Sequence, residues 1–85
     1  MNMPEVVNDE YSTRDLYLAT YLTVRAINLK NLVKGSDNRF TFYFQYDKVT
    51  QKEIDDFYSK KAQVEPLDFA TSMKAIKSKM YNLSN

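Results

Sequence analysis

Residues 39–46 read Arg-Phe-Thr-Phe-Tyr-Phe-Gln-Tyr, and five of these eight residues are aromatic. Alternate side chains of a β-strand point to opposite faces of its sheet. The face that we expect to be buried consists of Phe40, Phe42, Phe44 and Tyr46. The opposite face consists of Thr41, Tyr43 and Gln45. This strand should anchor the fold, because large aromatic side chains supply much of the core of a small domain.

A turn and a second strand are expected directly before this segment. Residues 35–38, Gly-Ser-Asp-Asn, are all turn formers and include the only glycine of the chain. Residues 28–34 fit a short strand, and hairpin loops of about four residues are common. The sequence therefore predicts a two-stranded antiparallel hairpin.

A central helix is expected before the hairpin. Ser12 or Thr13 is a suitable N-cap, and the helix should run to about Ile27 or Asn28. Apolar residues leave little of its surface polar, so we expect it to be covered on more than one side.

Two further helices are expected after the hairpin. Thr50 and Glu53 have the spacing of a capping box, which predicts a helix to about Lys60. Pro66 suits the first position of a last helix that runs to about Tyr81. The inner stripe of that helix consists of Phe69, Met73, Ile76 and Met80.

These elements predict a single compact α+β domain with the order α-β-β-α-α, in which the hairpin packs against the helices. A chain of 85 residues has room for one core only. We expect a flexible N-terminal lead over residues 1–10, the domain over residues 11–82 and a C-terminal tail over residues 83–85.

The composition excludes several classes of protein. There is no cysteine, which excludes disulfides and thiolate metal sites and favours a reducing compartment. The most apolar stretch, residues 16–27, is too short to cross a bilayer, and the N-terminus has no secretory signal pattern. We therefore expect a cytoplasmic protein with no membrane partner.

Catalysis is not expected either. Histidine is absent, and a single glycine leaves no phosphate-binding loop. Asp55 and Asp56 are adjacent in a predicted helix, where their side chains diverge by about 100°. The sequence thus predicts no enzyme, no cofactor, no metal ion and no small-molecule substrate.

Several segments together resemble a small family of short bacterial and phage proteins, a domain of unknown function. These segments are Tyr11-Ser-Thr-Arg-Asp-Leu-Tyr-Leu-Ala-Thr-Tyr-Leu22, the aromatic strand and the stretch from Phe57 to Phe69. The resemblance covers about residues 11–82. A glycine often follows the first helix in that family, whereas Ala26-Ile27-Asn28 stands here. The resemblance implies the fold and a link to phages or mobile elements, and it implies no catalytic residue.

The leading hypothesis is a small accessory or regulatory protein that acts through protein contacts. The chain has seven tyrosines and four methionines, residue types that are enriched in contact surfaces. Tyr43 is the aromatic ring that we expect to be exposed on the sheet. The partner is another protein or a second copy of the chain, and a homodimer could form by strand addition at an open sheet edge.

The alternative is a weak single-stranded nucleic-acid binder. It would use Tyr43 for base stacking, with Arg39 and the lysines of the last helix, Lys74, Lys77 and Lys79, for phosphates. Twelve basic residues against eleven acidic ones give a net charge of +1, which counts against a dedicated duplex binder. Lysines on a terminal helix are also common on a solvated face that binds nothing.

Overall fold

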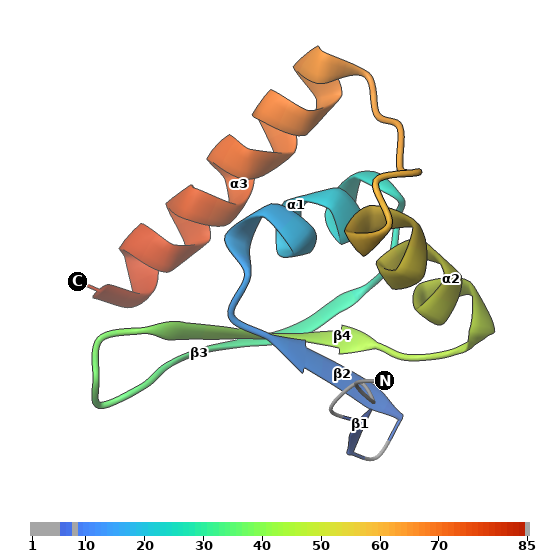
Figure 1. The fold of residues 1–85 in the computed structure, drawn as a ribbon. Helices are drawn as coiled ribbons and strands as arrows, with labels where there is room; N and C mark the ends of the chain where they lie inside the picture. Colours follow the sequence, from blue (N-terminus) through green and yellow to red (C-terminus); the bar gives the residue numbers. More distant parts are fainter. Residues whose placement is uncertain (1–5, 8, 85) are drawn as a thin grey trace.

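One layer of helices covers one face of an antiparallel sheet in the computed structural model, which describes residues 6, 7 and 9–84 (Figure 1). The elements within these residues are β1 (Val6–Val7), β2 (Glu10–Thr13), α1 (Leu16–Val24), β3 (Leu29–Lys34), β4 (Phe40–Gln45), α2 (Lys48–Tyr58) and α3 (Pro66–Ser84). The strands lie in the order β1-β2-β4-β3. The α+β class and the single domain are confirmed.

The prediction for the aromatic strand is confirmed in β4. Phe42 and Phe44 are 1% and 0% exposed and face the helices, while Phe40 is half-buried and packs against the same core. The hairpin is confirmed as well, since β3 pairs antiparallel with β4 across the turn at residues 35–38.

The prediction of a two-stranded sheet is wrong. On its other side β4 pairs with β2, with Tyr11 opposite Phe44 and Thr13 opposite Phe42, and β2 pairs in turn with β1. The sheet of the described residues has four strands, and the element order is β-β-α-β-β-α-α. β2 has one aromatic residue among polar ones, so its alternation is weak, and two strands alone would be marginally stable.

The predicted ends of the domain change accordingly. Strands β1 and β2 include residues 6, 7 and 10, within the segment expected to be a flexible lead, and residues 1–5 and 8 lie outside the described part of the chain. Helix α3 continues through Ser84 into the expected tail, and residue 85 is not among those described.

The start of α1 differs from the prediction. Asp15 is the N-cap, because its Oδ1 accepts the N–H groups of Tyr17 at 2.9 Å and Leu18 at 3.1 Å. Ser12 and Thr13 belong to β2, and Thr13 Oγ1 accepts the N–H of Asp15. A run of several capping residues is ambiguous in sequence, and the strand pairing takes the first ones.

The end of α1 is a Schellman motif. The N–H of Ile27 donates to the carbonyl of Leu22 at 2.9 Å, and the N–H of Ala26 donates to that of Thr23 at 3.0 Å. Ala26 has a φ of 63°, the left-handed conformation that usually belongs to glycine at this position. The helix thus ends at Val24, earlier than predicted. Ala26 occupies the position of this turn at which glycine is the usual residue.

The start of α2 also differs from the predicted capping box. Asp47 is the N-cap, and its Oδ1 accepts the N–H of Thr50 at 2.9 Å. Thr50 lies inside the helix, is 0% exposed and donates its hydroxyl to the carbonyl of Gln45 at 2.9 Å. Asp47 is the stronger capping residue and comes first in the chain.

The predictions for the packing of α1 and α3 are confirmed. Five consecutive residues of α1, Leu18 to Leu22, are buried, so this short helix is covered on several sides. Helix α3 packs on α1 and on β3. It buries Ile76, and the other residues of its predicted stripe, Phe69, Met73 and Met80, are half-buried.

Candidate contact surface on the sheet

The sheet face opposite the helices, here called the outer face, is open in the described part of the chain (Figure 1). Residues that pair across neighbouring antiparallel strands lie on the same face. From the register, the outer face consists of Glu10 and Ser12 in β2, Asn31 and Val33 in β3, and Thr41, Tyr43 and Gln45 in β4. Tyr43 lies on the inner strand β4, between Ser12 and Asn31.

Two ion pairs link the strands that flank β4. Lys30 Nζ lies 3.5 Å from Glu10 Oε2, and Arg14 Nη1 lies 3.2 Å from Asp37 Oδ2. Each pair joins β2 or its end to β3 or the turn after it, although β2 and β3 are not neighbours in the sheet. All four side chains are about one-third to one-half exposed, so each pair adds at most about 1 kcal/mol to stability.

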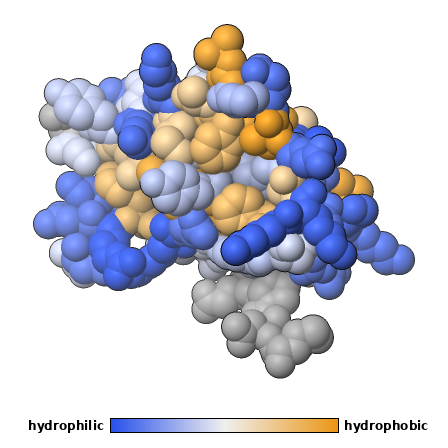
Figure 2. All heavy atoms as spheres, turned by 45° about the horizontal axis from the view of Figure 1, so that its top comes forward, coloured by the Kyte–Doolittle hydropathy of each residue, from blue (hydrophilic) through white to orange (hydrophobic). Residues whose placement is uncertain are grey.

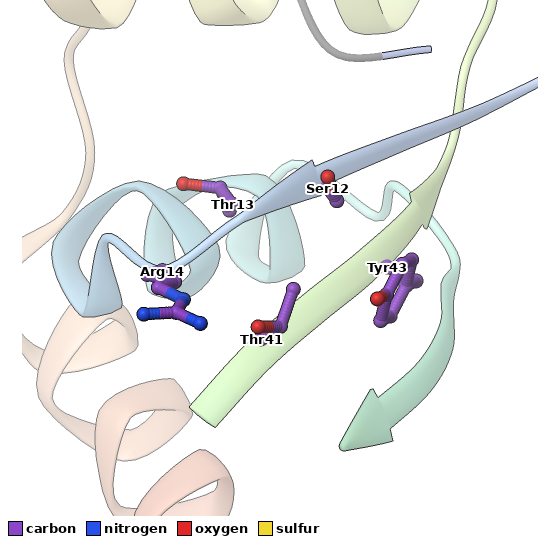
Figure 3. Close-up of a pocket in the computed structure, with 5 residues that line it drawn as sticks. All are labelled: Ser12, Thr13, Arg14, Thr41 and Tyr43. Carbon is purple, nitrogen blue, oxygen red and sulfur yellow. The ribbon is translucent and has the colours of Figure 1, made fainter. Parts of the chain in front are cut away.

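A pocket with a volume of about 380 Å³ lies beside Tyr43, lined by Ser12, Thr13, Arg14, Thr41 and Tyr43 (Figure 3). We call it the outer-face pocket. Arg14 extends beside Thr41, and Tyr43 lies two residues further along β4 (Figure 3). The lining of the outer-face pocket thus combines hydroxyl groups, a guanidinium group and an aromatic ring.

Arg39 is exposed and directly precedes β4 on the same alternation as Thr41 and Tyr43. Its carbonyl accepts the N–H of Gly35 at 2.8 Å, which closes the hairpin turn. Of the predicted contact residues, Tyr43 therefore lies in β4 and Arg39 directly before it.

The structure does not bring the three lysines together with Tyr43. Lys74, Lys77 and Lys79 are exposed on α3, which belongs to the helix layer on the other side of the sheet. At about 100° per residue, Lys79 points about 140° away from Lys74 and about 160° away from Lys77 around the helix axis. The three charges flank the buried stripe of α3 and do not form one track.

The helix layer carries a second exposed surface. Figure 2 shows apolar residues in the middle of this side of the molecule with polar residues around them. The exposed large hydrophobic side chains of the three helices are Tyr17, Val49, Tyr58, Leu67, Tyr81 and Leu83. Three of the seven tyrosines, Tyr17, Tyr58 and Tyr81, are more than half exposed.

A buried polar cluster joins α1 to α2. Glu53 is 8% exposed and accepts the hydroxyl of Tyr21 at 2.5 Å and the Nε–H of Arg25 at 3.2 Å. Burial and the Glu53 carboxylate raise the pKa of Tyr21 to about 12. Both carboxylate oxygens have a donor, so the cluster fits a structural role. The cluster could not be predicted from the sequence, because Glu53 fits a capping box and its partners lie far away along the chain.

A second tyrosine–carboxylate contact joins the same helices. Tyr58 donates its hydroxyl to Asp15 Oδ2 at 2.9 Å, and partial desolvation of the hydroxyl together with this carboxylate raises the pKa of Tyr58. Asp15 thereby caps α1 with one oxygen and holds the end of α2 with the other.

The described residues contain neither a cluster of metal-binding side chains nor a helix that could span a membrane. They include no group of three or more acidic side chains placed to hold a metal ion. None of the helices in this part of the chain is long and apolar enough to span a membrane.

A family model described as a domain of unknown function, DUF5659, matches residues 8–82. No curated protein and no solved structure matches the chain.

Proposed function

The chain belongs to the DUF5659 family, whose description gives no activity, and we propose that it is a small non-catalytic protein that acts through protein contacts. The outer face is the proposed contact surface. A cytoplasmic accessory role connected with a phage or a mobile element is part of this proposal, and its support is the resemblance to short bacterial and phage proteins.

The observation that carries the proposal is an open face of a four-stranded sheet with Tyr43 near its middle. The opposite face of the same sheet is buried by helices, so the sheet is a rigid support for contact residues. Tyrosine gives a large contact area at a low entropic cost and is enriched at protein interfaces.

The charges of the outer face favour a protein over a polyanion. Lys30 is paired with Glu10 and Arg14 with Asp37, so positive and negative groups alternate on this surface. A surface that binds a phosphate backbone has an excess of positive charge. Mixed charges around a central aromatic residue are typical of the rim and the centre of a protein interface.

Self-association is one form of this proposal. Among the described strands, β3 pairs on one side only, with β4. An open strand edge allows a second copy to add its own β3 across a two-fold axis. Sedimentation of the purified protein at several concentrations would detect such a dimer.

The proposal is tested by capturing partners with Tyr43→Ala. Wild-type protein and the variant are immobilised and exposed to a nuclease-treated lysate of the native host, and the retained proteins are compared. Tyr17→Ala is the matched control, because Tyr17 is 62% exposed on α1 in the helix layer.

We expect Tyr43→Ala to lose the specifically retained protein, or the dimer if sedimentation shows one, while Tyr17→Ala keeps it. The opposite pattern would move the contact surface to the helix layer and contradict the proposal.

Single-stranded nucleic-acid binding is the second candidate function. It is favoured by one observation, that Tyr43 lies in β4 beside the exposed Arg14, while Arg39 directly precedes the same strand. An aromatic ring next to cationic side chains can stack a base and contact a phosphate.

This candidate is tested by titrating a labelled oligonucleotide at two salt concentrations. We expect no salt-sensitive binding by the wild-type protein. Salt-sensitive binding whose log–log slope falls by about 1 when Arg14 and Arg39 are changed together to glutamine, and is unchanged when Lys74, Lys77 and Lys79 are changed to glutamine, would support nucleic-acid binding on the outer face instead.

A further inference from the structure

We infer that the outer-face pocket binds a carboxylate group from an acidic segment of the protein partner, with Arg14 as the cation that receives it. This inference rests on the proposed function and adds the chemical character of the partner. It follows from the hydrogen-bond donors around the pocket and from a carboxylate of the chain itself that already contacts Arg14.

Each side chain around the pocket can donate a hydrogen bond, and the Arg14 guanidinium group can only donate. Arg14 uses one nitrogen, Nη1, for its contact with Asp37, and a guanidinium group has five N–H donors in a planar fork. Within the described residues, the hydroxyls of Thr41 and Tyr43 have no hydrogen-bond partner. Hydrogen-bond donors around one pocket favour a ligand that only accepts hydrogen bonds, and an ionised carboxylate is such a ligand.

Asp37 shows that a carboxylate fits against Arg14. Its Oδ2 contacts Arg14 at 3.2 Å, and its Oδ1 accepts the N–H of Arg39 at 3.1 Å. That N–H and the nearby Arg14 charge hold the pKa of Asp37 below its ordinary value, so the group stays ionised at neutral pH. Both side chains of the pair are nearly half exposed.

The contact between Arg14 and Asp37 is weak enough to be exchanged. Ion pairs between exposed side chains contribute little to stability, because water and salt screen them. A partner that covers the pocket excludes water and strengthens a new contact to Arg14. Asp37 then acts as an internal competitor for the guanidinium group.

The local charge suits one carboxylate better than a row of phosphates. Arg14 is the one cation in the lining of the pocket, and Asp37 already contacts it, so the pocket has no excess of positive charge for several phosphates. The next cation on this face, Lys30, is paired with Glu10, whose carboxylate would repel a second phosphate.

The test measures binding of a short labelled peptide in which glutamate alternates with valine, a pattern that favours an extended chain. The same peptide with glutamine in place of glutamate is the ligand control, and a labelled single-stranded oligonucleotide is the third probe. Fluorescence anisotropy gives the dissociation constant for each protein variant.

Two variants should change the affinity in opposite directions. Asp37→Asn removes the competitor and should tighten binding of the glutamate peptide about two- to fivefold, while Arg14→Gln should weaken it about tenfold or more. Lys77→Gln on α3 and the exposed Asp55→Asn on α2 make the same changes in net charge away from the pocket and should have little effect.

The outcomes separate the inference from the proposed function. No saturable binding of the glutamate peptide, or equal binding of the glutamine peptide, overturns the inference, as does an Asp37→Asn variant that binds no more tightly than Asp55→Asn. Tighter, Arg14-dependent binding of the oligonucleotide assigns the pocket to a phosphodiester and also overturns it. If Tyr43→Ala still loses the captured protein while Arg14→Gln keeps it, the contact surface stands and the carboxylate site does not.

Thermal unfolding of every variant is recorded alongside. Arg14 and Asp37 are surface residues, so both variants should fold. If Arg14→Gln did not fold, the comparison of Asp37→Asn with Asp55→Asn would still decide the question.

Discussion

At the scale of single residues, Ala26 adopts a conformation that costs an L-amino acid about 1–2 kcal/mol. Ala26→Gly removes this strain but adds freedom to the unfolded chain, so we expect a net stabilisation of about 0.5–1 kcal/mol. Urea denaturation of both proteins measures the difference.

The Schellman hydrogen bonds at the end of α1 are the reason for this expectation. Ala70→Gly, at an exposed position inside α3, is the control and should destabilise by about 1 kcal/mol. A loss of stability in Ala26→Gly would mean that the left-handed turn does not form.

Tyr21 makes a second prediction at this scale. Tyr21→Phe removes a donor from the buried Glu53 carboxylate and should destabilise the protein by about 1–3 kcal/mol at neutral pH. The pKa of Tyr21 is raised from 10.0 to about 12 in the folded state, so folding favours its neutral form. The contribution of the neutral Tyr21 hydroxyl to the unfolding free energy is therefore complete below about pH 10 and is lost as the pH rises toward about 12.

The measurement is the difference in unfolding free energy between wild type and Tyr21→Phe, taken near pH 8 and near pH 11. Effects of the other ionisable groups largely cancel in this difference. The difference should shrink at the higher pH, and a constant difference would contradict the hydrogen bond to Glu53.

At the scale of elements, the two faces of β4 predict opposite results for neighbouring substitutions. Phe42 is 1% exposed beneath the helices, so Phe42→Ala should cost about 3–5 kcal/mol through lost burial and a cavity. Thr41 lies on the outer face, and Thr41→Ala should change stability by about 0.5 kcal/mol or less. Chemical denaturation of the two variants checks the facing of the strand, and similar losses in both would contradict it.

The same elements show what the sequence could predict. β4 and α3 were predicted because their apolar periodicity is strong and local, and the hairpin because its turn residues have few other uses. β2 was missed because its stability comes from pairing with residues far along the chain, and because its Ser and Thr are also good helix caps. The N-caps of α1 and α2 were misplaced for the related reason that several capping residues lie close together.

The candidate site could be predicted only in part. Alternation along β4 was sufficient to place Tyr43 on the face away from the core, and the structure agrees. Arg14, Ser12 and Thr13 could not be placed beside it, because only the unpredicted pairing of β2 brings them there.

At the scale of the whole molecule, the position of β2 predicts how the protein tolerates truncation. A chain that begins at residue 8 loses β1, an edge strand, and should remain folded, in agreement with the family match over residues 8–82. A chain that begins at residue 14 loses β2 and the buried Tyr11, and should show no cooperative thermal transition by circular dichroism. A cooperative transition in the shorter chain would show that β2 is dispensable.

The pairing of β2 with β4 also sets an order on the folding reaction. The β3–β4 hairpin closes a short loop and can form early. The pairing of β2 with β4, in which Glu10 lies opposite Gln45, closes a longer loop that contains α1 and β3. Until β2 docks, one edge of β4 is unpaired and can accept β2 from another molecule. We therefore expect refolding at high protein concentration to yield domain-swapped dimers with exchanged N-terminal strands, and refolding at low concentration to yield the closed monomer.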